Sequence, residues 1–416
     1  MNTISIGIDV SCSELVVCLL DNDGHIIGEI QTFQNSLPGA EKLEKLILKT
    51  AKKVKSDQIL IATESTSIYD LHIIDFLASS ISLKSLNTSA FRFNAKVIKN
   101  FKRAYLEENK TDAKDAFIIA ERLRFRKPKH EYTANMPHLP LQRLTRYRFH
   151  IVDSIRKETQ YFLTNLFLKY NRFRNMNIFS DSTGHTCISI INDFTAEELA
   201  SMSLEDVTNF IINESKNQFK DPKSIAKTLK QVVRESYRLR PTMAKSINFI
   251  LCGCIQNIRV LKASLKQLNK AIDSELKCFP NTLTTVNGIG PVFTAGIIAE
   301  IGDISRFASD SQLAKFAGLT WNIKQSGKFN AEETRLNAKG NQFLRYYLCE
   351  AANSLRVHNE IFKTYYKKKY DEVPKYRHKR AIVLTARKLI RLLFALLTKK
   401  QLYDTSLPAE RRFSRK

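Results

Sequence analysis

The sequence has few cysteines, and their arrangement suggests neither a disulfide framework nor a zinc site. Seven cysteines are scattered over 416 residues. The one close pair, Cys252 and Cys254, lacks both the spacing and the second pair of ligands that a zinc site requires. An odd number of cysteines, mostly within apolar segments, favours reduced thiols and a cytoplasmic protein.

The sequence also lacks the patterns of a signal peptide and of a membrane-spanning segment. The first residues contain no basic segment followed by an apolar one, so we expect no signal peptide. The long apolar stretch near the end, Ala381 to Leu397, is interrupted by Arg387, Lys388 and Arg391. Burying these charges in a bilayer is costly, so we expect no membrane partner.

Acidic residues are scarce relative to basic ones. The chain has 66 Lys and Arg against 41 Asp and Glu, which gives a formal net charge of +25. Such an excess implies a polyanionic partner, a nucleic acid, that is bound less tightly as salt increases. With 416 residues, 43% of them hydrophobic, the chain is long enough for two or three domains with cores of their own.

The N-terminal part follows the element order of a ribonuclease H-like sheet, in which the first strand is central. Three strands come first and helices then alternate with strands. Ala116, Phe117, Ala120 and Leu123 give the last helix a face for the sheet. The sequence therefore predicts an α/β domain over residues 1–130. Its predicted elements are strands Ile4–Val10, Glu14–Leu20 and His25–Phe33, helix Pro38–Lys55, strand Ile59–Glu64, helix Ile68–Ala78, a strand near Ile81–Leu86, and helix Thr111–Arg126.

Four acidic residues stand at the ends of these elements. Asp9 and Glu64 end two apolar strands, whereas Asp112 and Asp115 face the same way at the start of a helix. Divalent cations prefer oxygen ligands, and a metal pair stabilises both the attacking and the leaving oxygen at a phosphodiester. Each acid taken singly is explained equally well as a strand-end or helix-start residue. Their convergence favours a site for two divalent cations.

The rest of the chain is predicted to be mainly α-helical. Long helices at Ile151–Phe167 and Ile255–Leu276 bracket a less regular stretch, Phe173–Arg240, so residues 139–276 are expected to form a helical or coiled-coil linker with an insertion. A compact unit follows at 279–360.

A basic helical tail is predicted over residues 361–416. Between Lys363 and Lys400 there are 13 Lys and Arg and two acids. Tyr365, Tyr366 and Tyr370 could stack on bases there, and a solvated helix explains them equally well.

Two motifs in the 279–360 unit suggest contacts with DNA. Thr285–Gly296 resembles a helix-hairpin-helix turn, in which Gly288 and Gly290 let the backbone approach a phosphate; a plain turn is the alternative. Farther on, Ser326 precedes a glycine and could attack phosphorus if nearby cations neutralise the phosphate, although Ser-Gly by itself is typical of a turn. These cations are Lys324, Lys328, Arg335, Lys339 and Arg345.

In this order, the motifs resemble those of the transposases of insertion-sequence family 110, which also includes the Piv-type DNA invertases. The resemblance covers about residues 1–125 and 280–360. The chain departs from the family at Trp321, where proline is common, and in a longer middle segment. The motifs that carry the resemblance are Gly7-Ile-Asp9, Glu64, Lys110–Ala116, Asn287–Pro291, Ala317–Leu319, Ser326-Gly327 and Lys339–Arg345.

The resemblance implies a site-specific recombinase with a RuvC-like DEDD domain and a separate C-terminal transposase domain. Asp9, Glu64, Asp112 and Asp115 would hold magnesium, two ions in all, with Mn²⁺ as a substitute, and Ser326 would become joined to DNA. The implied partners are donor and target DNA, a structured guide (bridge) RNA, and further copies of the chain, dimers that assemble into a tetramer. The expected location is the prokaryotic cytoplasm, at the nucleoid.

Three other functions remain open. A metal-dependent RuvC-like nuclease or Holliday-junction resolvase would use the acids with water as the nucleophile. A Piv-type invertase would share the site but not the transposition. A non-catalytic nucleic-acid-binding protein would have lost the acids, so the intact quartet argues against it. A covalent protein–DNA adduct separates the serine recombinases from the other two.

Overall fold

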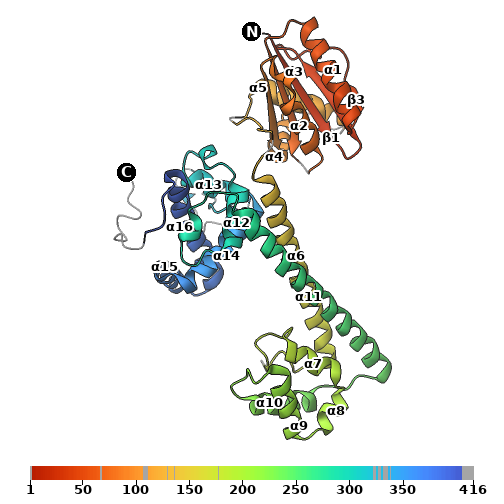
Figure 1. Cartoon of the computed structure of the whole chain (residues 1–416), viewed down its shortest axis with the longest axis vertical. Helices are drawn as coiled ribbons and strands as arrows, with labels where there is room; N and C mark the ends of the chain where they lie inside the picture. The colour runs from red at the N-terminus through yellow and green to blue at the C-terminus, as the bar shows by residue number, and fades with distance from the viewer. Residues whose placement is uncertain are drawn as a thin grey trace. The chain divides into compact units, whose positions relative to one another are not determined.

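The chain forms two compact units, Met1–Pro137 and His138–Lys416. In Figure 1 the colour runs from red at the N-terminus to blue at the C-terminus, so the two units can be followed by residue number. The computed structural model describes residues 2–65, 68–105, 111–128, 130–134, 136–176, 178–321, 325–326, 329–330, 336–337 and 339–404. Among these residues, no helix combines the length and the apolar composition that a membrane span requires.

A mixed five-stranded sheet forms the centre of the N-terminal unit, with strand order β3-β2-β1-β4-β5. β1 pairs antiparallel with β2 and parallel with β4. The prediction that the first strand is central is therefore confirmed. The strands are β1 (Thr3–Val10), β2 (Glu14–Leu20), β3 (Gln31–Gln34), β4 (Gln58–Ser65) and β5 (Thr88–Asn94).

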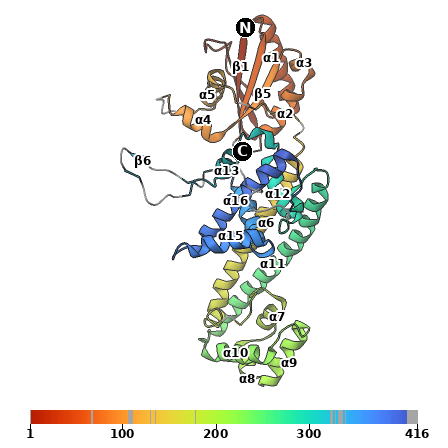
Figure 2. The ribbon, with the colours of Figure 1, turned by 90° about the vertical axis from the view of Figure 1, so that its left-hand side faces the viewer.

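Helices cover both faces of this sheet (Figure 2). On one face, α1 (Leu37–Lys53), α2 (Asp70–Ser79) and α3 (Ile81–Lys84) share a core with alternate residues of β1, namely Ile4, Ile6 and Ile8. On the other face, α4 (Ala95–Lys102) and α5 (Asp112–Phe125) pack on the intervening strand residues. Because side chains alternate along a strand, each strand residue belongs to one of these two layers.

Two predicted strands differ from the structure. The segment near Ile81–Leu86 is wrong as a strand, because the Ser80 hydroxyl accepts the Leu83 amide and starts the helical turn α3. The strand comes later, as β5, where Phe91 and Phe93 are buried. The third strand is only β3 rather than His25–Phe33, since the chain bends at Gly28, whose φ is +79°.

Two long helices of the C-terminal unit, α6 (Leu139–Lys169) and α11 (Pro241–Leu276), pack along each other (Figure 2). A hydrophobic core forms at each end of the pair. One includes Ile272 and the helices that follow α11, and the other includes Phe162 and the helices between α6 and α11.

The predicted irregular stretch between α6 and α11 is largely helical. It contains α7 (His185–Asp193), α8 (Ala196–Ser201), α9 (Leu204–Ser215) and α10 (Pro222–Glu235). Its polar residues gave an irregular pattern because several are N-caps: the side chains of Thr195, Ser203 and Asp221 accept amides at the starts of α8, α9 and α10.

The remaining elements of the C-terminal unit are mainly helices, with two turns of 3-10 helix and one pair of two-residue strands. The predominance of helices agrees with the predicted order of an α/β part followed by a mainly helical part. These elements are η1 (Leu283–Thr285), α12 (Pro291–Ile301), η2 (Ile304–Arg306), α13 (Asp310–Ala317), β6 (Gln325–Ser326), β7 (Phe329–Asn330), α14 (Gln342–His358), α15 (Glu360–Asp371) and α16 (Arg377–Lys399).

Candidate catalytic residues and nucleic-acid contacts

Asp9 and Glu64 occupy neighbouring positions at the carboxyl ends of two parallel strands. In the ladder between β1 and β4, Ile8 is paired with Thr63, and each acid is the next residue of its strand. Both acids are half-buried. The register therefore places the two predicted strand-tip carboxylates side by side on adjacent strands.

The two acids also share the face of the sheet that α5 covers. Asp9 alternates with Gly7, and a Cβ at Gly7 would lie 2.2 Å from the carbonyl oxygen of Ala116 and 2.3 Å from the nitrogen of Ala120. Helix α5 thus lies directly on β1, an approach that only glycine permits. Glu64 alternates with Ala62, which packs in the core cluster of α5.

Helix α5 runs antiparallel to β1. Arg124, near its C-terminus, donates a hydrogen bond to the carbonyl of Asn22 (2.9 Å), and the Asn22 side chain accepts the amide of Thr3 at the start of β1 (3.2 Å). The N-terminal turn of α5, with Asp112 and Asp115, therefore lies toward the end of the sheet where Asp9 and Glu64 stand.

The four acids share one face and one end of the sheet without forming a closed cluster. Among the described residues, no three of these carboxylates have oxygens within 4.8 Å of one another. Asp112 is exposed, and Asp115 forms an ion pair with Lys102 at the end of α4. The oxygen donors suit divalent cations, and Lys102 occupies one of them. No sequence signal had marked Lys102.

A separate group, Asp21, Asp23 and His25, has its ligand atoms within 4.8 Å among the described residues. Asp21 Oδ1 accepts the amides of Asp23, Gly24 and His25, each at 2.9 Å. Slight burial raises the pKa of the Asp21 carboxyl, but these amide hydrogen bonds outweigh it and lower the pKa. The group therefore stabilises the turn after β2.

Ser326 lies on β6, paired with Phe329 of the antiparallel strand β7. The segment that carries this hairpin leaves and re-enters the unit at one place. There Trp321 bridges to Leu336, and the Asn337 amide donates to the carbonyl of Thr320 (2.6 Å). We call these paired residues the hairpin root. The predicted cations Lys324, Lys328 and Arg335 lie outside the described residues.

Two other predicted cations have known positions. Lys339 is exposed just after the hairpin root. Arg345 is half-buried on α14, where its guanidinium donates to the carbonyl of Ala317 at the end of α13 (3.2 Å). Arg345 thus has a structural contact in addition to its predicted role toward nucleic acid.

Gly288 and Gly290 have different surroundings. Gly288 has φ +101°, and a Cβ there would contact Leu355 and His358 of α14. Gly290 is the exposed N-cap of α12, with open space where a Cβ would lie. Only one turn of 3-10 helix, η1, precedes them, so the first helix of a helix-hairpin-helix is reduced to that turn. The open side of Gly290 remains a candidate phosphate contact.

The tail forms α15 and α16, and its tyrosines already face cations of the protein. Lys388 lies 4.4 Å from the ring centre of Tyr365, and Arg377 lies 4.5 Å from that of Tyr370. Tyr376, which the sequence did not single out, is 82% exposed at the start of α16. The acids Glu360, Asp371 and Glu372 pair with nearby cations. Several tail lysines are exposed without a described ion pair, among them Lys367, Lys368, Lys375 and Lys379.

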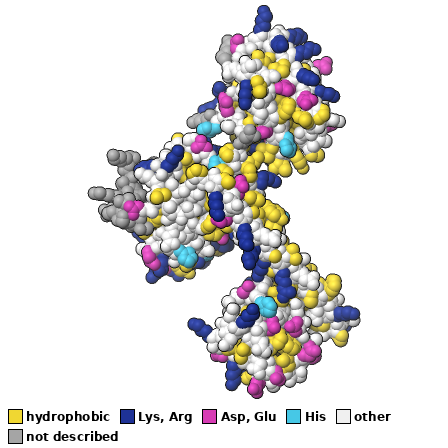
Figure 3. All heavy atoms as spheres, in the orientation of Figure 1, with side chains coloured by type: hydrophobic (Ala, Val, Ile, Leu, Met, Phe, Trp, Pro, Cys, Tyr) yellow, Lys and Arg dark blue, Asp and Glu magenta, His cyan; other side chains and the backbone are white. Residues whose placement is uncertain are grey.

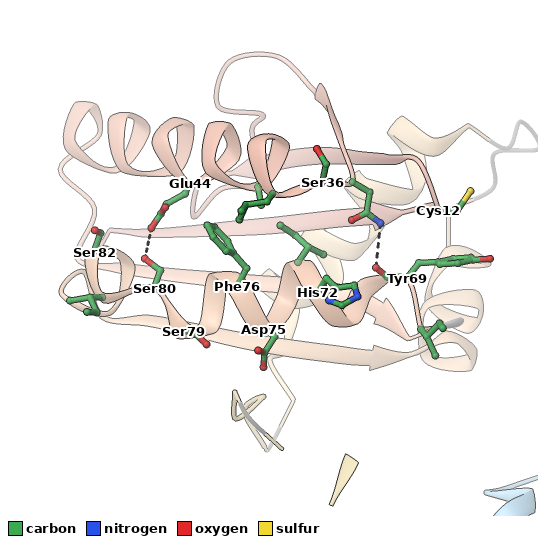
Figure 4. A pocket seen from close by; sticks show the side chains of 16 residues that line it. Cys12, Ser36, Glu44, Tyr69, His72, Asp75, Phe76, Ser79, Ser80 and Ser82 are labelled. Atoms are coloured by element: carbon green, nitrogen blue, oxygen red, sulfur yellow. Dashed lines mark hydrogen bonds between the residues drawn. The ribbon is translucent and has the colours of Figure 1, made fainter. Parts of the chain in front are cut away.

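A groove of about 910 Å³ lies between α1 and α2 of the N-terminal unit (Figure 4). Its lining includes Tyr69, His72 and Phe76, and a hydrogen bond joins Asn35 to the Tyr69 carbonyl along one side. The groove is on the α1 and α2 face of the sheet, opposite the face that α5 and the four acids share. It is therefore separate from the candidate metal site.

Comparisons with known proteins match two stretches of the chain. A family model for the DEDD transposase of IS110, described as "Transposase", matches residues 6–170. A second, described as "Transposase IS116/IS110/IS902 family", matches residues 281–367. Between them the two matches include the four acids, Ser326 and both glycines, and they cover more than half of the chain.

Proteins of insertion elements are among the relatives. The insertion element IS116 uncharacterized 44.8 kDa protein of Streptomyces clavuligerus is 23% identical over 73% of this chain and 75% of its own length. The insertion element IS900 uncharacterized 42 kDa protein of Mycobacterium paratuberculosis is 25% identical over 72% and 74%. The chain belongs to the IS110 family of insertion-element transposases, enzymes that recombine DNA.

Proposed function

We propose that this transposase cuts and rejoins DNA through a phosphoserine intermediate at Ser326, assisted by magnesium at Asp9, Glu64, Asp112 and Asp115. The observation that carries the metal half is the common face and common end of the four acids, built from strand register and the direction of α5. Bound divalent cations would neutralise the phosphate and stabilise its attacking and leaving oxygens. A RuvC-like, ribonuclease H-type fold accounts for the same strand order.

The serine supplies the nucleophile. Its Oγ forms a bond to phosphorus while the bond from phosphorus to one deoxyribose oxygen breaks, and the serine proton is passed on so that the leaving oxygen becomes a hydroxyl. In rejoining, a deoxyribose hydroxyl attacks the same phosphorus and releases the serine. Because each step exchanges one phosphate ester for another, the reaction needs no nucleoside triphosphate.

The acids and the serine belong to different units of the chain. We propose that they act on one phosphodiester within an oligomer, a dimer that assembles into a tetramer with donor and target DNA. A structured guide RNA would select these DNA sequences. The excess of 25 positive charges and the exposed tail lysines support a large nucleic-acid surface.

The test is to denature the wild-type enzyme during its reaction with labelled DNA and to map any covalent adduct. We expect a DNA strand that only protease removes, attached to Ser326, and formed with Mg²⁺ but without ATP. RNA sequencing of the purified protein tests the guide. Ser326→Ala should lose the adduct while the protein stays folded and binds nucleic acid.

Two outcomes would overturn this proposal. Free cleaved ends without an adduct would favour the water-using nuclease, for which the acids suffice. An adduct at another residue would remove Ser326 from the mechanism. Inversion of a DNA segment by the purified enzyme, rather than insertion, would instead favour the Piv-type invertase with the same chemistry.

A further inference from the structure

Helix α12 carries one carboxylate, Glu300, within an otherwise apolar segment. Its side chain has no exposed surface, and its partners lie on α6 and at the start of α14. Both helices pack against α12 (Figure 1). An ionised carboxylate is costly to bury unless it is paired and hydrogen-bonded. Glu300 therefore requires partners that offset the cost of burying its charge.

Glu300 binds a cation from α6 and an amide from the start of α14. Arg146 donates from Nε to Oε1 (2.7 Å) and from Nη2 to Oε2 (3.0 Å), a bidentate pair. Asn341 donates from Nδ2 to Oε2 (2.7 Å). Arg146 also lies over the ring of Phe343, 4.6 Å from its centre. One buried carboxylate thus fixes two separate segments to α12.

Asn341 is held at each of its polar groups. Its Oδ1 accepts the amides of Phe343 and Leu344, both at 3.0 Å, and so caps α14. The backbone amide of Asn341 donates to the carbonyl of Phe316 in α13 (2.7 Å). Its Nδ2 is the group that reaches Glu300. Asn341 therefore joins α14, α13 and the buried ion pair.

These contacts lie next to the hairpin root in the chain. Gly340, directly before Asn341, packs so closely on the C-terminal end of α13 that a Cβ would be 2.5 Å from the nitrogen of Gly318. Between Gly318 and Gly340 the chain passes through the root pairs of Trp321 with Leu336 and Thr320 with Asn337. The segment with Ser326 thus starts and returns beside the residue that Glu300 holds.

We propose that Glu300 is a positioning residue for Ser326: through Asn341 it fixes the hairpin root relative to α6 and α12. A buried ion pair contributes little to stability compared with a well-packed apolar replacement, but it accepts only one geometry. This proposal rests on the proposed role of Ser326. Loss of the Glu300 contacts should therefore affect the placement of the serine more than the stability of the fold.

The experiment compares Glu300→Gln and Asn341→Ser with the control Tyr347→Phe in the full chain. Asn341→Ser keeps a capping oxygen and removes the donor to Glu300. The Tyr347 hydroxyl donates to the carbonyl of Thr145 (2.6 Å), so Tyr347→Phe removes a buried link between the same helices, α14 and α6, without touching the root. Thermal unfolding, DNA affinity and the rate of adduct formation at saturating DNA and Mg²⁺ are measured for each.

A second readout does not depend on catalysis. Trp321 is the single tryptophan of the chain and belongs to the hairpin root, so its fluorescence emission and anisotropy report the geometry of the root. Glu300→Gln and Asn341→Ser should alter this signal and slow adduct formation about tenfold to 100-fold, because small misplacements of a reacting group have effects of this size. DNA affinity should change less than about twofold, and the double variant should be no slower than either single one.

Tyr347→Phe, at an equal or larger loss of thermal stability, should leave both the Trp321 signal and the adduct rate near those of the wild type. An unchanged Trp321 signal in Glu300→Gln, or rate losses that only follow the loss of thermal stability in all three variants, would overturn the positioning role. If the wild type forms no adduct while Glu300→Gln still shifts the Trp321 signal, the serine mechanism fails and the anchoring of the root stands.

Discussion

Asp9 and Ser326 are attached to the protein in contrasting ways. Asp9 follows Gly7 on the central strand of a sheet, and its place is set by the register with β4 and by the contact of α5 with Gly7. Ser326 lies on a two-residue strand whose segment is tied to the unit at its root. The acids therefore depend on the core of the N-terminal unit, whereas the serine depends on a few anchoring contacts.

This difference predicts that the two sites fail differently. Asp9→Asn should lower strand cleavage about 1000-fold, since each loss of about 1.4 kcal/mol of phosphate stabilisation lowers the rate tenfold. DNA binding and the unfolding midpoint should stay close to wild type. Cleavage assays with Mg²⁺ check this, with Asp23→Asn, an exposed turn acid of the same unit, as the control. Cleavage by Asp9→Asn at the wild-type rate would remove Asp9 from the site.

The second prediction tests whether the acid site depends on the core. Gly7→Val should destabilise the N-terminal unit by at least about 3 kcal/mol, because its side chain would collide with the backbone of α5. Denaturant unfolding monitored by circular dichroism measures the loss. Gly253→Ala in α11, where a Cβ meets open space, should be neutral or slightly stabilising. A stable Gly7→Val protein would show that α5 can move away without harm to the sheet.

A third prediction concerns binding by the serine-bearing unit. Replacing Lys367, Lys368, Lys375 and Lys379 by Ala should weaken duplex binding about tenfold or more and reduce the slope of log affinity against log salt by about 3 units. Measuring affinity by fluorescence anisotropy at several salt concentrations tests this.

The matched control is a set of four exposed lysines in the segment between α6 and α11: Lys216, Lys220, Lys223 and Lys227. Residues 170–240 contain 10 basic and 9 acidic residues. Figure 3 shows both signs interspersed on the visible face of this segment. An equal change of slope in the two variants would mean that the tail contributes only net charge.

The smallest expected effect concerns the ion pair within the acid site. Lys102→Met should lower the Mg²⁺ concentration needed for half-maximal cleavage about two- to fivefold, because a partly exposed ion pair is worth less than about 1 kcal/mol. Titration of Mg²⁺ checks this, with Lys99→Met on the exposed side of α4 as the control. A higher requirement in Lys102→Met would instead mean that Lys102 contacts the DNA phosphate.

The four acids can be singled out from the sequence more directly than the surroundings of Ser326, for a physical reason. Strand ends and a helix start are local patterns, so Asp9, Glu64, Asp112 and Asp115 could be singled out from short segments. Their common face then followed from the period of a strand. Nothing in the local pattern marked Lys102, because its contact with Asp115 depends on how α4 turns after β5.

The hairpin root could not be predicted from short segments. Glu300, which binds Asn341 beside the root, stands in the sequence only as an acid near the end of an apolar helix. Its partner Arg146 is 154 residues earlier in the chain. The four helices after α6 were missed for a related reason, since capping residues resemble loop residues until the helix that they cap is known. The wrong strand at Ile81–Leu86 shows that a short apolar run does not separate a strand from a helical turn.

The pairing of α6 with α11 has a consequence for how this protein can diverge or be engineered. At 31 and 36 residues, the two helices are about 46 and 54 Å long. The helices α7 to α10 share a core with one end of the pair, and the hairpin root belongs to the core at the other end. We therefore expect that α7 to α10 can be replaced by a short loop or by a foreign domain. The core that contains the hairpin root would keep its own packing, because it shares no residues with the core of α7 to α10.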